Sequence, residues 1–319
     1  MSKMKAMQVV TPGKPMELVE VPIPTPAADQ VLIEVETCGV CNGDSAAIEG
    51  KARNYPLIPG HEVIGRIAEL GADVTNWEVD QRVGIGYHAG SDQVNGRTIN
   101  GGFAQYMTAN ADRIVQIPAE ISSAEASPLM CAGETTFSAL RNSQASAGDI
   151  VAIQGLGGLG HLAVQYAKKI GFETVAISRG KEKQALIKSL GADHYIDSLE
   201  ENIGEVLQKL GGAKVILSTV PSGAAIAPLI PGLKKHGQLV VVSGSNEPFN
   251  ISPSQLLTKY LSITGSFTAG KDEIKQMLRF SELNDVKPLI ETFPLEMANE
   301  AFEKMKQSEV KFRAVLEIN

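Results

Sequence analysis

The sequence is poor in cysteine, in aromatic residues and in uninterrupted hydrophobic runs. Its 3 cysteines in 319 residues are unlike the dense, even-numbered disulfide frameworks of secreted domains, so we expect reduced thiols. Aromatic residues make up 5% and include a single tryptophan, and no aromatic cage or stripe is visible. No apolar run approaches the roughly 18 residues that cross a bilayer. These absences exclude a disulfide-rich scaffold and a membrane-spanning chain.

The charge balance excludes a further class of partner. The formal net charge is −7 at pH 7 and no basic block or Lys/Arg stripe is present, so we expect neither a nucleic acid nor an anionic membrane surface as a partner. Hydrophobic residues at 43% and charged residues at 20% are ordinary for a folded globular protein. Residues 1–6 lead into a strand-like segment instead of the apolar core of a signal peptide. We therefore expect a cytoplasmic protein that acts on a small molecule.

The pattern of predicted elements changes along the chain. Residues 5–118 read as short β segments that proline and glycine interrupt. Residues 122–143 read as helical, with Ser122 or Ser123 as the N-cap. Beyond them short apolar strands alternate with helical stretches, and the strands are expected at 149–154, 174–178, 194–196, 214–218, 238–244 and 261–265. Alternation at this spacing predicts βαβ units, a doubly wound parallel sheet and the α/β class.

The length and this change of pattern predict two domains. A chain of 319 residues exceeds the usual single-domain length. The last stretch contains two amphipathic helices and the strand "FRAVLEI", which we expect to return to the β-rich domain. The expected division is therefore a β-rich catalytic domain formed by 1–147 and 269–319, and a dinucleotide-binding domain formed by 148–268.

A glycine-rich motif opens the predicted dinucleotide-binding domain. Gly155, Gly157 and Gly160 form GxGxxG between a predicted strand and a predicted helix, and the loop also contains Gly158 and Leu159. Glycines let the backbone turn tightly and approach a pyrophosphate, while the helix N-terminus supplies free N–H donors and a positive dipole. The motif in this context predicts nucleotide binding.

The residues after the next predicted strand indicate which nucleotide is bound. A carboxylate about 20 residues beyond the motif would bond the 2′-hydroxyl of NAD. The strand instead ends at Ser178 and Arg179, and Lys183 follows soon after. Two cations without a carboxylate favour the 2′-phosphate of NADP(H) over NAD(H). The alternative is that both cations are solvated at the start of a helix.

Three segments contain residues suited to a metal. His61 lies in "IPGHEVIG", Cys131 lies in "LMCAGETT", and the stretch "CGVCNGD" adds Cys38 and Cys41. A set of two cysteines and one histidine is the ligand type of a catalytic zinc that keeps its fourth position open. From the residues alone the CxxC pair has three interpretations: a redox pair, half of a structural zinc clasp, or one ligand beside an idle neighbour.

These motifs carry a family resemblance. The series CGVCxxD, GHExxG, CAG with a threonine four positions after its cysteine, and GxGxxG resembles the zinc-dependent medium-chain alcohol dehydrogenases over essentially the whole chain. It is most similar to their NADP-preferring, cinnamyl-alcohol-dehydrogenase-like branch. The resemblance implies a GroES-like β-rich catalytic domain, a Rossmann domain, an active cleft between the two, and transfer of hydride between an alcohol or aldehyde and NADP(H).

The resemblance also assigns roles to individual residues. In the family pattern the ligand is the cysteine three residues before the aspartate, which leaves Cys38 as a small buried hydrophobe. The resemblance implies a single catalytic zinc with Cys41, His61 and Cys131 as its ligands. Glu62 is implied as a nearby carboxylate or a transient fourth ligand, and Asp44 as a residue that orients the site. The cofactor contacts implied are Thr135 at the nicotinamide and Arg313 at the pyrophosphate.

The sequence departs from the family at several positions. Gly43 stands where many relatives have a serine or threonine hydroxyl that relays a proton, and Glu134, which we expect to point to solvent, stands where an apolar residue is usual. The four closely spaced cysteines of a structural zinc lobe are missing, so we expect no structural zinc, and the junction at 90–92 looks like a deletion.

Two other functions and the assembly state stay open. A zinc-free quinone or enoyl reductase uses the same frame and does not need the three ligands. Gly43 and the missing lobe also leave room for a non-catalytic nucleotide-binding relative. The resemblance implies a homodimer or homotetramer joined partly through sheet edges, and nothing in the sequence identifies the alcohol or aldehyde.

Overall fold

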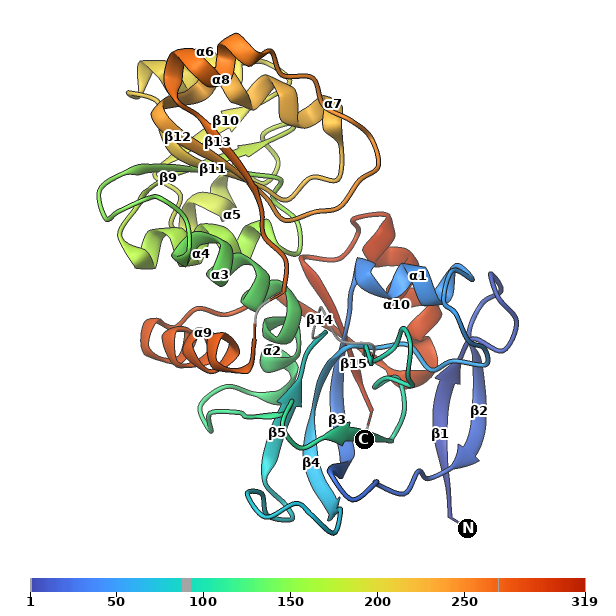
Figure 1. The fold of residues 1–319 in the computed structure, drawn as a ribbon. Coiled ribbons are helices and arrows are strands. Elements are labelled where there is room, and N and C mark those ends of the chain that lie inside the picture. The colour runs from blue at the N-terminus through green and yellow to red at the C-terminus, as the bar shows by residue number, and fades with distance from the viewer. Residues whose placement is uncertain (1, 88–92, 269, 319) are drawn as a thin grey trace. The chain divides into compact units, whose positions relative to one another are not determined.

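The computed structural model describes residues 2–87, 93–268 and 270–318 (Figure 1). By its internal contacts the chain divides into two compact units. The first unit is Met1–Glu134 together with Thr268–Asn319, and the second unit is Thr135–Phe267. The sequence analysis expects the first boundary after residue 147 and the second after residue 268, whereas the contacts divide the chain after Glu134 and after Phe267. The expected deletion at 90–92 lies outside the described residues.

The first unit is built on a mostly antiparallel sheet that contains both early and late segments of the chain, with β14 and β15 paired in parallel. The sheet has the strand order β14-β15-β3-β4-β5-β7, with β6 paired to β3, and β1 and β2 form a separate hairpin. The strands of the whole unit are β1 (Lys3–Gln8), β2 (Glu17–Pro22), β3 (Gln30–Val40), β4 (Glu62–Leu70), β5 (Arg82–Ile85), β6 (Tyr106–Asn110), β7 (Val115–Gln116), β14 (Ile290–Pro294) and β15 (Arg313–Glu317). Its helical segments are η1 (Asn42–Asp44), α1 (Ser45–Ile48), α2 (Ser123–Pro128), η2 (Leu129–Gly133), α9 (Lys271–Asn284), η4 (Leu295–Met297) and α10 (Ala298–Lys306).

The central strand of this sheet is β3, which is flanked by β4 on one side and by β15 on the other. Val31, Ile33 and Val35 of β3 are fully buried, together with Val63 of β4 and Leu316 of β15. Each such side chain contributes about 1.5–3 kcal/mol relative to an exposed one. The register pairs Gly39 with Glu62 in β4 and with Val315 in β15. This register fixes which polar residues meet at the end of β3.

The second unit is the doubly wound α/β fold that the sequence predicts. Its six strands are all parallel and follow the order β10-β9-β8-β11-β12-β13. The strands are β8 (Ile150–Gln154), β9 (Glu173–Ser178), β10 (His194–Asp197), β11 (Ala213–Ser218), β12 (Leu233–Val241) and β13 (Ser262–Gly265). The helical segments are α4 (Gly160–Ile170), α5 (Gln184–Ser189), α6 (Ile203–Lys209), α7 (Gly223–Ile226), η3 (Ala227–Gly232) and α8 (Pro253–Lys259). The strand order reverses between β8 and β11, which is where dinucleotides bind in such sheets.

The helix expected at 122–143 is divided into α2, the wide turn η2 and α3 (Glu134–Arg141). Ser122 is the N-cap, and its side chain and that of Glu125 form a reciprocal capping box. Pro128 ends α2 because it has no N–H to continue the hydrogen-bond ladder. The five residues of η2 then form a π-helical turn, a feature that is frequent at functional sites.

Candidate metal centre

Four potential metal ligands meet in the first unit. The ligating atoms of Cys41, His61, Glu62 and Cys131 all lie within 4.8 Å of one another. Cys41 follows the last residue of β3, His61 immediately precedes β4, and Glu62 is the first residue of β4. Because β3 and β4 are antiparallel neighbours, the last residues of β3 lie beside the first residues of β4. The turn η2 brings Cys131 to the same place.

Asp44 holds two of these residues in place from the turn η1. Its Oδ2 accepts a hydrogen bond from the backbone N–H of Cys41 at 3.0 Å. Its Oδ1 lies 2.8 Å from Nδ1 of His61 and also accepts from the N–H of Gly60 at 3.2 Å. All four residues are buried. A buried carboxylate with this many partners can fix the ring orientation of the histidine.

His61 presents its second ring nitrogen to the cluster. Nε2 is buried and has no hydrogen-bond partner among the residues that the structure describes. With Nδ1–H donated to Asp44, the neutral ring would carry its lone pair on Nε2, which is the tautomer that a metal requires. The ring also packs edge-on against Tyr87, with centroids 5.2 Å apart. An orphaned buried nitrogen between two sulfurs and a carboxylate fits a metal ligand.

The two cysteines of the cluster are in direct contact, and either thiol could donate a hydrogen bond to the other. Their sulfur atoms lie 3.9 Å apart. The hydrogen bond from Cys131 holds the pKa of Cys41 well below its ordinary value, and His61 acts in the same direction. The same hydrogen bond raises the pKa of Cys131, and burial raises it further. The lowered pKa of Cys41 favours its thiolate, which is the form that binds a metal.

Histidine and glutamate respond to the same buried environment. Burial lowers the pKa of His61, but the Asp44 carboxylate and the Cys41 sulfur raise it by more, so the net pKa is well above the ordinary value. Burial raises the pKa of Glu62 to about 8, against the opposing effect of the Arg313 guanidinium. These groups compete for protons in the metal-free cluster, so binding of a metal is coupled to release of protons.

Arg313 makes a buried ion pair with one of these residues. Its side chain is 4% exposed and Nη2 donates to both carboxylate oxygens of Glu62, while its expected contact with the cofactor pyrophosphate stays a prediction. The physical reason is the register of β15 with β3, which places the first residue of β15 next to the end of β3. The carboxylate in turn holds the pKa of Arg313 above its ordinary value, although burial opposes this. The guanidinium therefore binds a carboxylate of the metal-ligand cluster.

Two other residues near the cluster can now be placed. Cys38 is fully buried in the core, and its thiol contacts the carbonyl of Gly39 at 3.7 Å, while burial raises its pKa. It is outside the cluster, as the resemblance implies. Glu134 was expected to point to solvent, and that expectation is wrong because the residue is fully buried. It directly follows the turn η2, in which four of the five residues are buried.

The glycine loop lies in the second unit between β8 and α4. Gly155 has a φ of +86°, and a Cβ there would lie 2.5 Å from Oγ1 of Thr219. A Cβ at Gly160 would lie 1.7 Å from the carbonyl oxygen of Gly155, so the helix approaches the strand closely. A Cβ at Gly157 would meet nothing within 4 Å. The loop therefore offers an approachable backbone in front of the N-terminus of an 11-residue helix.

The two cations expected at the ribose lie beside this loop. Ser178 ends β9, and the exposed Arg179 follows it. Nζ of the half-buried Lys183 donates to the carbonyl of Leu156 in the loop at 3.2 Å. Burial lowers the pKa of Lys183, and the charge of Arg179 lowers it further. Thr135, by contrast, lies buried in α3 and is the first residue of the second unit.

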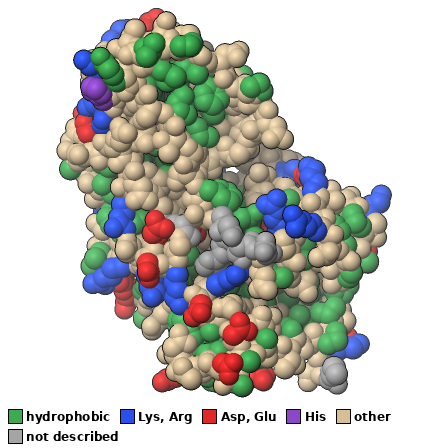
Figure 2. All heavy atoms as spheres, in the orientation of Figure 1, with side chains coloured by type: hydrophobic (Ala, Val, Ile, Leu, Met, Phe, Trp, Pro, Cys, Tyr) green, Lys and Arg blue, Asp and Glu red, His purple; other side chains and the backbone are tan. Residues whose placement is uncertain are grey.

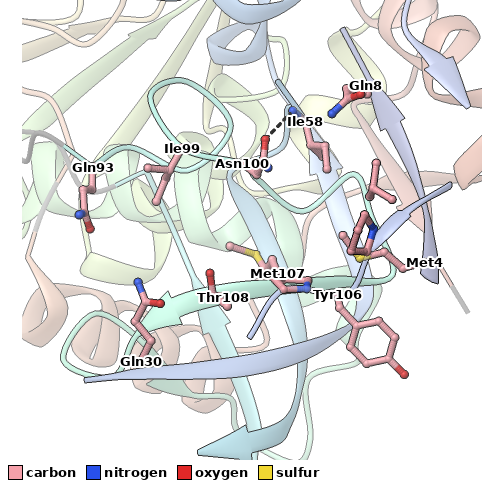
Figure 3. A pocket seen from close by; sticks show the side chains of 13 residues that line it. Met4, Gln8, Gln30, Ile58, Gln93, Ile99, Asn100, Tyr106, Met107 and Thr108 are labelled. Atoms are coloured by element: carbon pink, nitrogen blue, oxygen red, sulfur yellow. Dashed lines mark hydrogen bonds between the residues drawn. The ribbon is translucent and has the colours of Figure 1, made fainter. Parts of the chain in front are cut away.

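The structure also has a cavity of about 370 Å³ in the first unit (Figure 3). It lies by the N-terminal hairpin, where Met4 of β1 and Tyr106 and Met107 of β6 contribute to its wall. Oδ1 of Asn100 accepts a hydrogen bond from the N–H of Ile58 at 3.0 Å on its rim. None of the described residues that line it belongs to the metal-ligand cluster. The cavity is therefore separate from the candidate site.

Comparisons with known proteins cover both units. A family model described as an alcohol dehydrogenase GroES-like domain matches residues 27–119, and one described as a zinc-binding dehydrogenase matches residues 158–282. An alcohol dehydrogenase of Aspergillus sp. (strain MF297-2) is 41% identical over 322 residues, which cover 95% of this chain and 95% of that protein. A probable cinnamyl alcohol dehydrogenase of Populus deltoides is 32% identical and covers 91% of this chain and 88% of that protein.

Solved structures agree with this result. The thermostable alcohol dehydrogenase from Pyrobaculum aerophilum, solved with cobalt and zinc bound, superimposes with a TM-score of 0.89 at 25% identity, over 99% of this chain and 100% of that chain. Within the described part of the chain, no helix is both long and apolar enough to cross a membrane.

Proposed function

The chain belongs to the zinc-binding alcohol dehydrogenase family and is a medium-chain oxidoreductase, and from this premise we propose that it is a zinc-dependent alcohol dehydrogenase or aldehyde reductase that prefers NADP(H). The family implies zinc and a nicotinamide cofactor. The observation that carries the proposal is the buried cluster of two cysteine sulfurs and one orphaned imidazole nitrogen.

The donor set fits one catalytic zinc. Two ligands on a tetrahedral zinc with Zn–S bonds of about 2.3 Å are separated by about 3.8 Å, and the two sulfurs lie 3.9 Å apart. Cys41, Cys131 and Nε2 of His61 would hold the ion. Zinc bound there would supply a Lewis acid that stabilises negative charge on the substrate oxygen. Asp44 would keep the imidazole in the ligating tautomer.

The proton of the alcohol needs a route that Gly43 does not provide. A Cβ at this position would lie 2.9 Å from Cε1 and 3.2 Å from Nε2 of His61, so the backbone of Gly43 packs directly on the ring. With no hydroxyl there, we infer that the proton leaves through water, the cofactor ribose or another side chain. This predicts a pH dependence of turnover that differs from that of relatives with a serine or threonine.

The cofactor would bind to the second unit through the glycine loop. Backbone N–H groups of the loop from Gly155 to Gly160 and the N-terminus of α4 would receive the pyrophosphate. Arg179 and Lys183 would receive the 2′-phosphate, which relieves the repulsion between two neighbouring cations. Thr135 is proposed to contact the nicotinamide.

Steady-state rates with an aldehyde panel test the proposal. NADPH oxidation should be measured before and after chelation, after zinc is restored, and again with NADH. We expect activity that chelation abolishes, that zinc restores and that is higher with NADPH. Quinone reduction that survives chelation would instead identify a zinc-free reductase. Tight NADPH binding without turnover of any alcohol or aldehyde would identify a non-catalytic relative.

We also propose that the chain forms a homodimer or homotetramer through the edge strand β13. Three of the four residues of β13 are exposed although the strand continues a hydrogen-bonded sheet. Leu257, Tyr260 and Phe267 nearby are 72%, 63% and 59% exposed, and Figure 2 shows hydrophobic side chains on the surface of this unit. An unpaired strand edge beside apolar side chains is suited to pairing with a second copy. Light scattering of an Ile263→Lys variant, expected to be monomeric, tests this.

The cellular location is proposed on chemical grounds alone. The three cysteines are free thiols, and two of them must stay reduced to bind a metal. A reducing compartment such as the cytoplasm supports this state.

A further inference from the structure

Gly39 lies inside the central strand β3, where glycine is normally unfavourable. Its backbone does not require glycine, because its φ lies outside the left-handed region. What it provides is space: a Cβ at this position would lie 2.0 Å from Oε2 of Glu62 and 3.0 Å from its Cβ and Cδ. The carboxylate of Glu62 therefore occupies the volume that any side chain at position 39 would fill.

Arg313 holds the same carboxylate from the other side of the strand. Gly39 pairs with Glu62 in β4, and its neighbour Val40 pairs with Ala314 in β15. The side chain of Glu62 thus crosses β3 above the glycine, and Nη2 of Arg313 donates to both of its oxygens. Glutamate and arginine are 0% and 4% exposed, so neither has water as an alternative partner.

The balance of charge favours keeping this carboxylate off the metal. Two thiolates neutralise a divalent ion, and the neutral imidazole adds no charge. Glu62 and Arg313 form a second neutral set beside the first. If the carboxylate moved to the metal, the first set would become anionic and the buried guanidinium would lose its counter-ion, which is costly in a low-dielectric interior.

We propose that Gly39 and Arg313 are positioning residues that hold Glu62 beside the metal instead of on it, so that the fourth ligand position stays open for substrate. This inference rests on the metal centre proposed above. Gly39 provides the clearance and Arg313 provides the attraction. Removing either leaves the metal as the nearest other cation for the carboxylate, whose ligating atom is within 4.8 Å of the other three.

The absorption spectrum of the cobalt(II)-substituted protein tests the proposal without measuring turnover. Its d–d bands report the number and type of ligands, and its thiolate charge-transfer band reports that both sulfurs bind. The single variants are Glu62→Gln, Gly39→Ala and Arg313→Gln. Two double variants combine Glu62→Gln with Gly39→Ala and with Arg313→Gln. Gly244→Ala is the matched control, because a Cβ at that glycine would meet nothing within 4 Å.

We expect Glu62→Gln and Gly244→Ala to keep the wild-type bands, and Gly39→Ala and Arg313→Gln to shift the d–d bands. Adding Glu62→Gln should restore the wild-type spectrum in both cases, which a general loss of structure would not allow. If Gly39→Ala does not fold, the comparison of Arg313→Gln with the double variant Arg313→Gln/Glu62→Gln still tests the proposal. A shift caused by Glu62→Gln alone, or unshifted bands in Arg313→Gln, would overturn the proposal. Absence of the thiolate band in the wild type would overturn the metal centre itself.

Discussion

The metal-ligand cluster and the glycine loop are built in opposite ways. The cluster consists of buried side chains from distant segments, and Arg313 and Glu62 are separated by 251 positions along the chain. The glycine loop consists of backbone within one strand–turn–helix unit, and of the cations beside it Arg179 is exposed and Lys183 is half-buried. One site depends on the register of a sheet, and the other on three positions without a Cβ.

This difference predicts different sensitivities. When one partner of a buried ion pair is removed, the protein loses much stability, since water cannot replace the missing charge. An exposed cation that contacts a phosphate contributes less to the free energy of binding, because water and salt partly screen its charge. Changes at the cluster should therefore affect metal, stability and activity together, whereas changes at the loop should affect cofactor binding alone.

The largest effect is expected from Cys131→Ala, which removes one of the two sulfurs. We expect loss of bound zinc and a fall in kcat/KM of about 10³-fold or more, because the Lewis acid contributes several kcal/mol of transition-state stabilisation. Metal analysis and steady-state kinetics check this, with Cys38→Ala, which removes a buried cysteine outside the cluster, as the matched control. Zinc retained at full occupancy in Cys131→Ala would contradict the assignment of this ligand.

The next effect is expected on stability. Arg313→Met leaves the buried carboxylate of Glu62 without its partner and, measured above pH 8 where Glu62 with a pKa of about 8 is ionised, should lower the free energy of unfolding by about 3–5 kcal/mol. The double variant with Glu62→Gln removes the stranded charge and should recover much of this loss. Urea unfolding of the metal-free protein measures both. Equal losses in the single and double variants would mean that the pair is not coupled.

Metal affinity should rise with pH. In the metal-free protein the pKa values of Cys131 and His61 are both raised, so these groups hold protons that a metal must displace, whereas the lowered pKa of Cys41 makes it a thiolate already. Below the ordinary histidine pKa of about 6.5 we expect release of about two protons and an affinity that changes about 100-fold per pH unit. Well above the raised pKa of His61 the slope should fall to about tenfold per unit. Chelator competition across pH measures the slope, and a flat profile would contradict these assignments.

Gly160→Ala should damage the cofactor site alone. Its Cβ would collide with the backbone carbonyl of Gly155, which cannot move aside cheaply, and a displacement of about 1 Å at such a contact can cost about 10²-fold. We expect weaker NADPH binding with unchanged zinc content. Fluorescence titration and metal analysis check the two halves of this expectation, and loss of zinc would show that the two sites are not independent.

The smallest effect is expected from Arg179→Ala. Loss of one charge-assisted contact with a 2′-phosphate should raise the KM for NADPH about tenfold and leave the KM for NADH unchanged. Lys209→Ala, which removes an exposed lysine from the end of α6, is a matched control. Parallel changes for both nucleotides would indicate that Arg179 does not distinguish them.

The same comparison explains how far the sequence could lead. The strand alternation predicts the doubly wound sheet because each βαβ unit is local, and the glycines specify their loop without any remote partner. The motifs around Cys41, His61 and Cys131 identify candidate ligands. No local pattern gives the contact between Glu62 and Arg313, because only the register of β4, β3 and β15 creates it. The one signal in the sequence is Arg313 itself, a charged residue at the start of the apolar strand "RAVLE", which indicates a buried partner of opposite charge.

The burial of Glu134 was missed for a related reason. The sequence predicts one continuous helix at 122–143, whose exposed face would carry a glutamate. The π-helical turn at Leu129–Gly133 changes the helical phase by one residue, and Glu134 begins the next segment fully buried. Such a turn follows from tertiary packing, which a periodic pattern does not contain.

Anomalous diffraction at the zinc edge from crystals grown with zinc tests the central claim most directly. The account predicts one peak in each copy of the chain, bound by Sγ of Cys41, Sγ of Cys131 and Nε2 of His61, with the Glu62 carboxylate still on Arg313. A cluster without a peak, or an imidazole turned away from the two sulfurs, would contradict it.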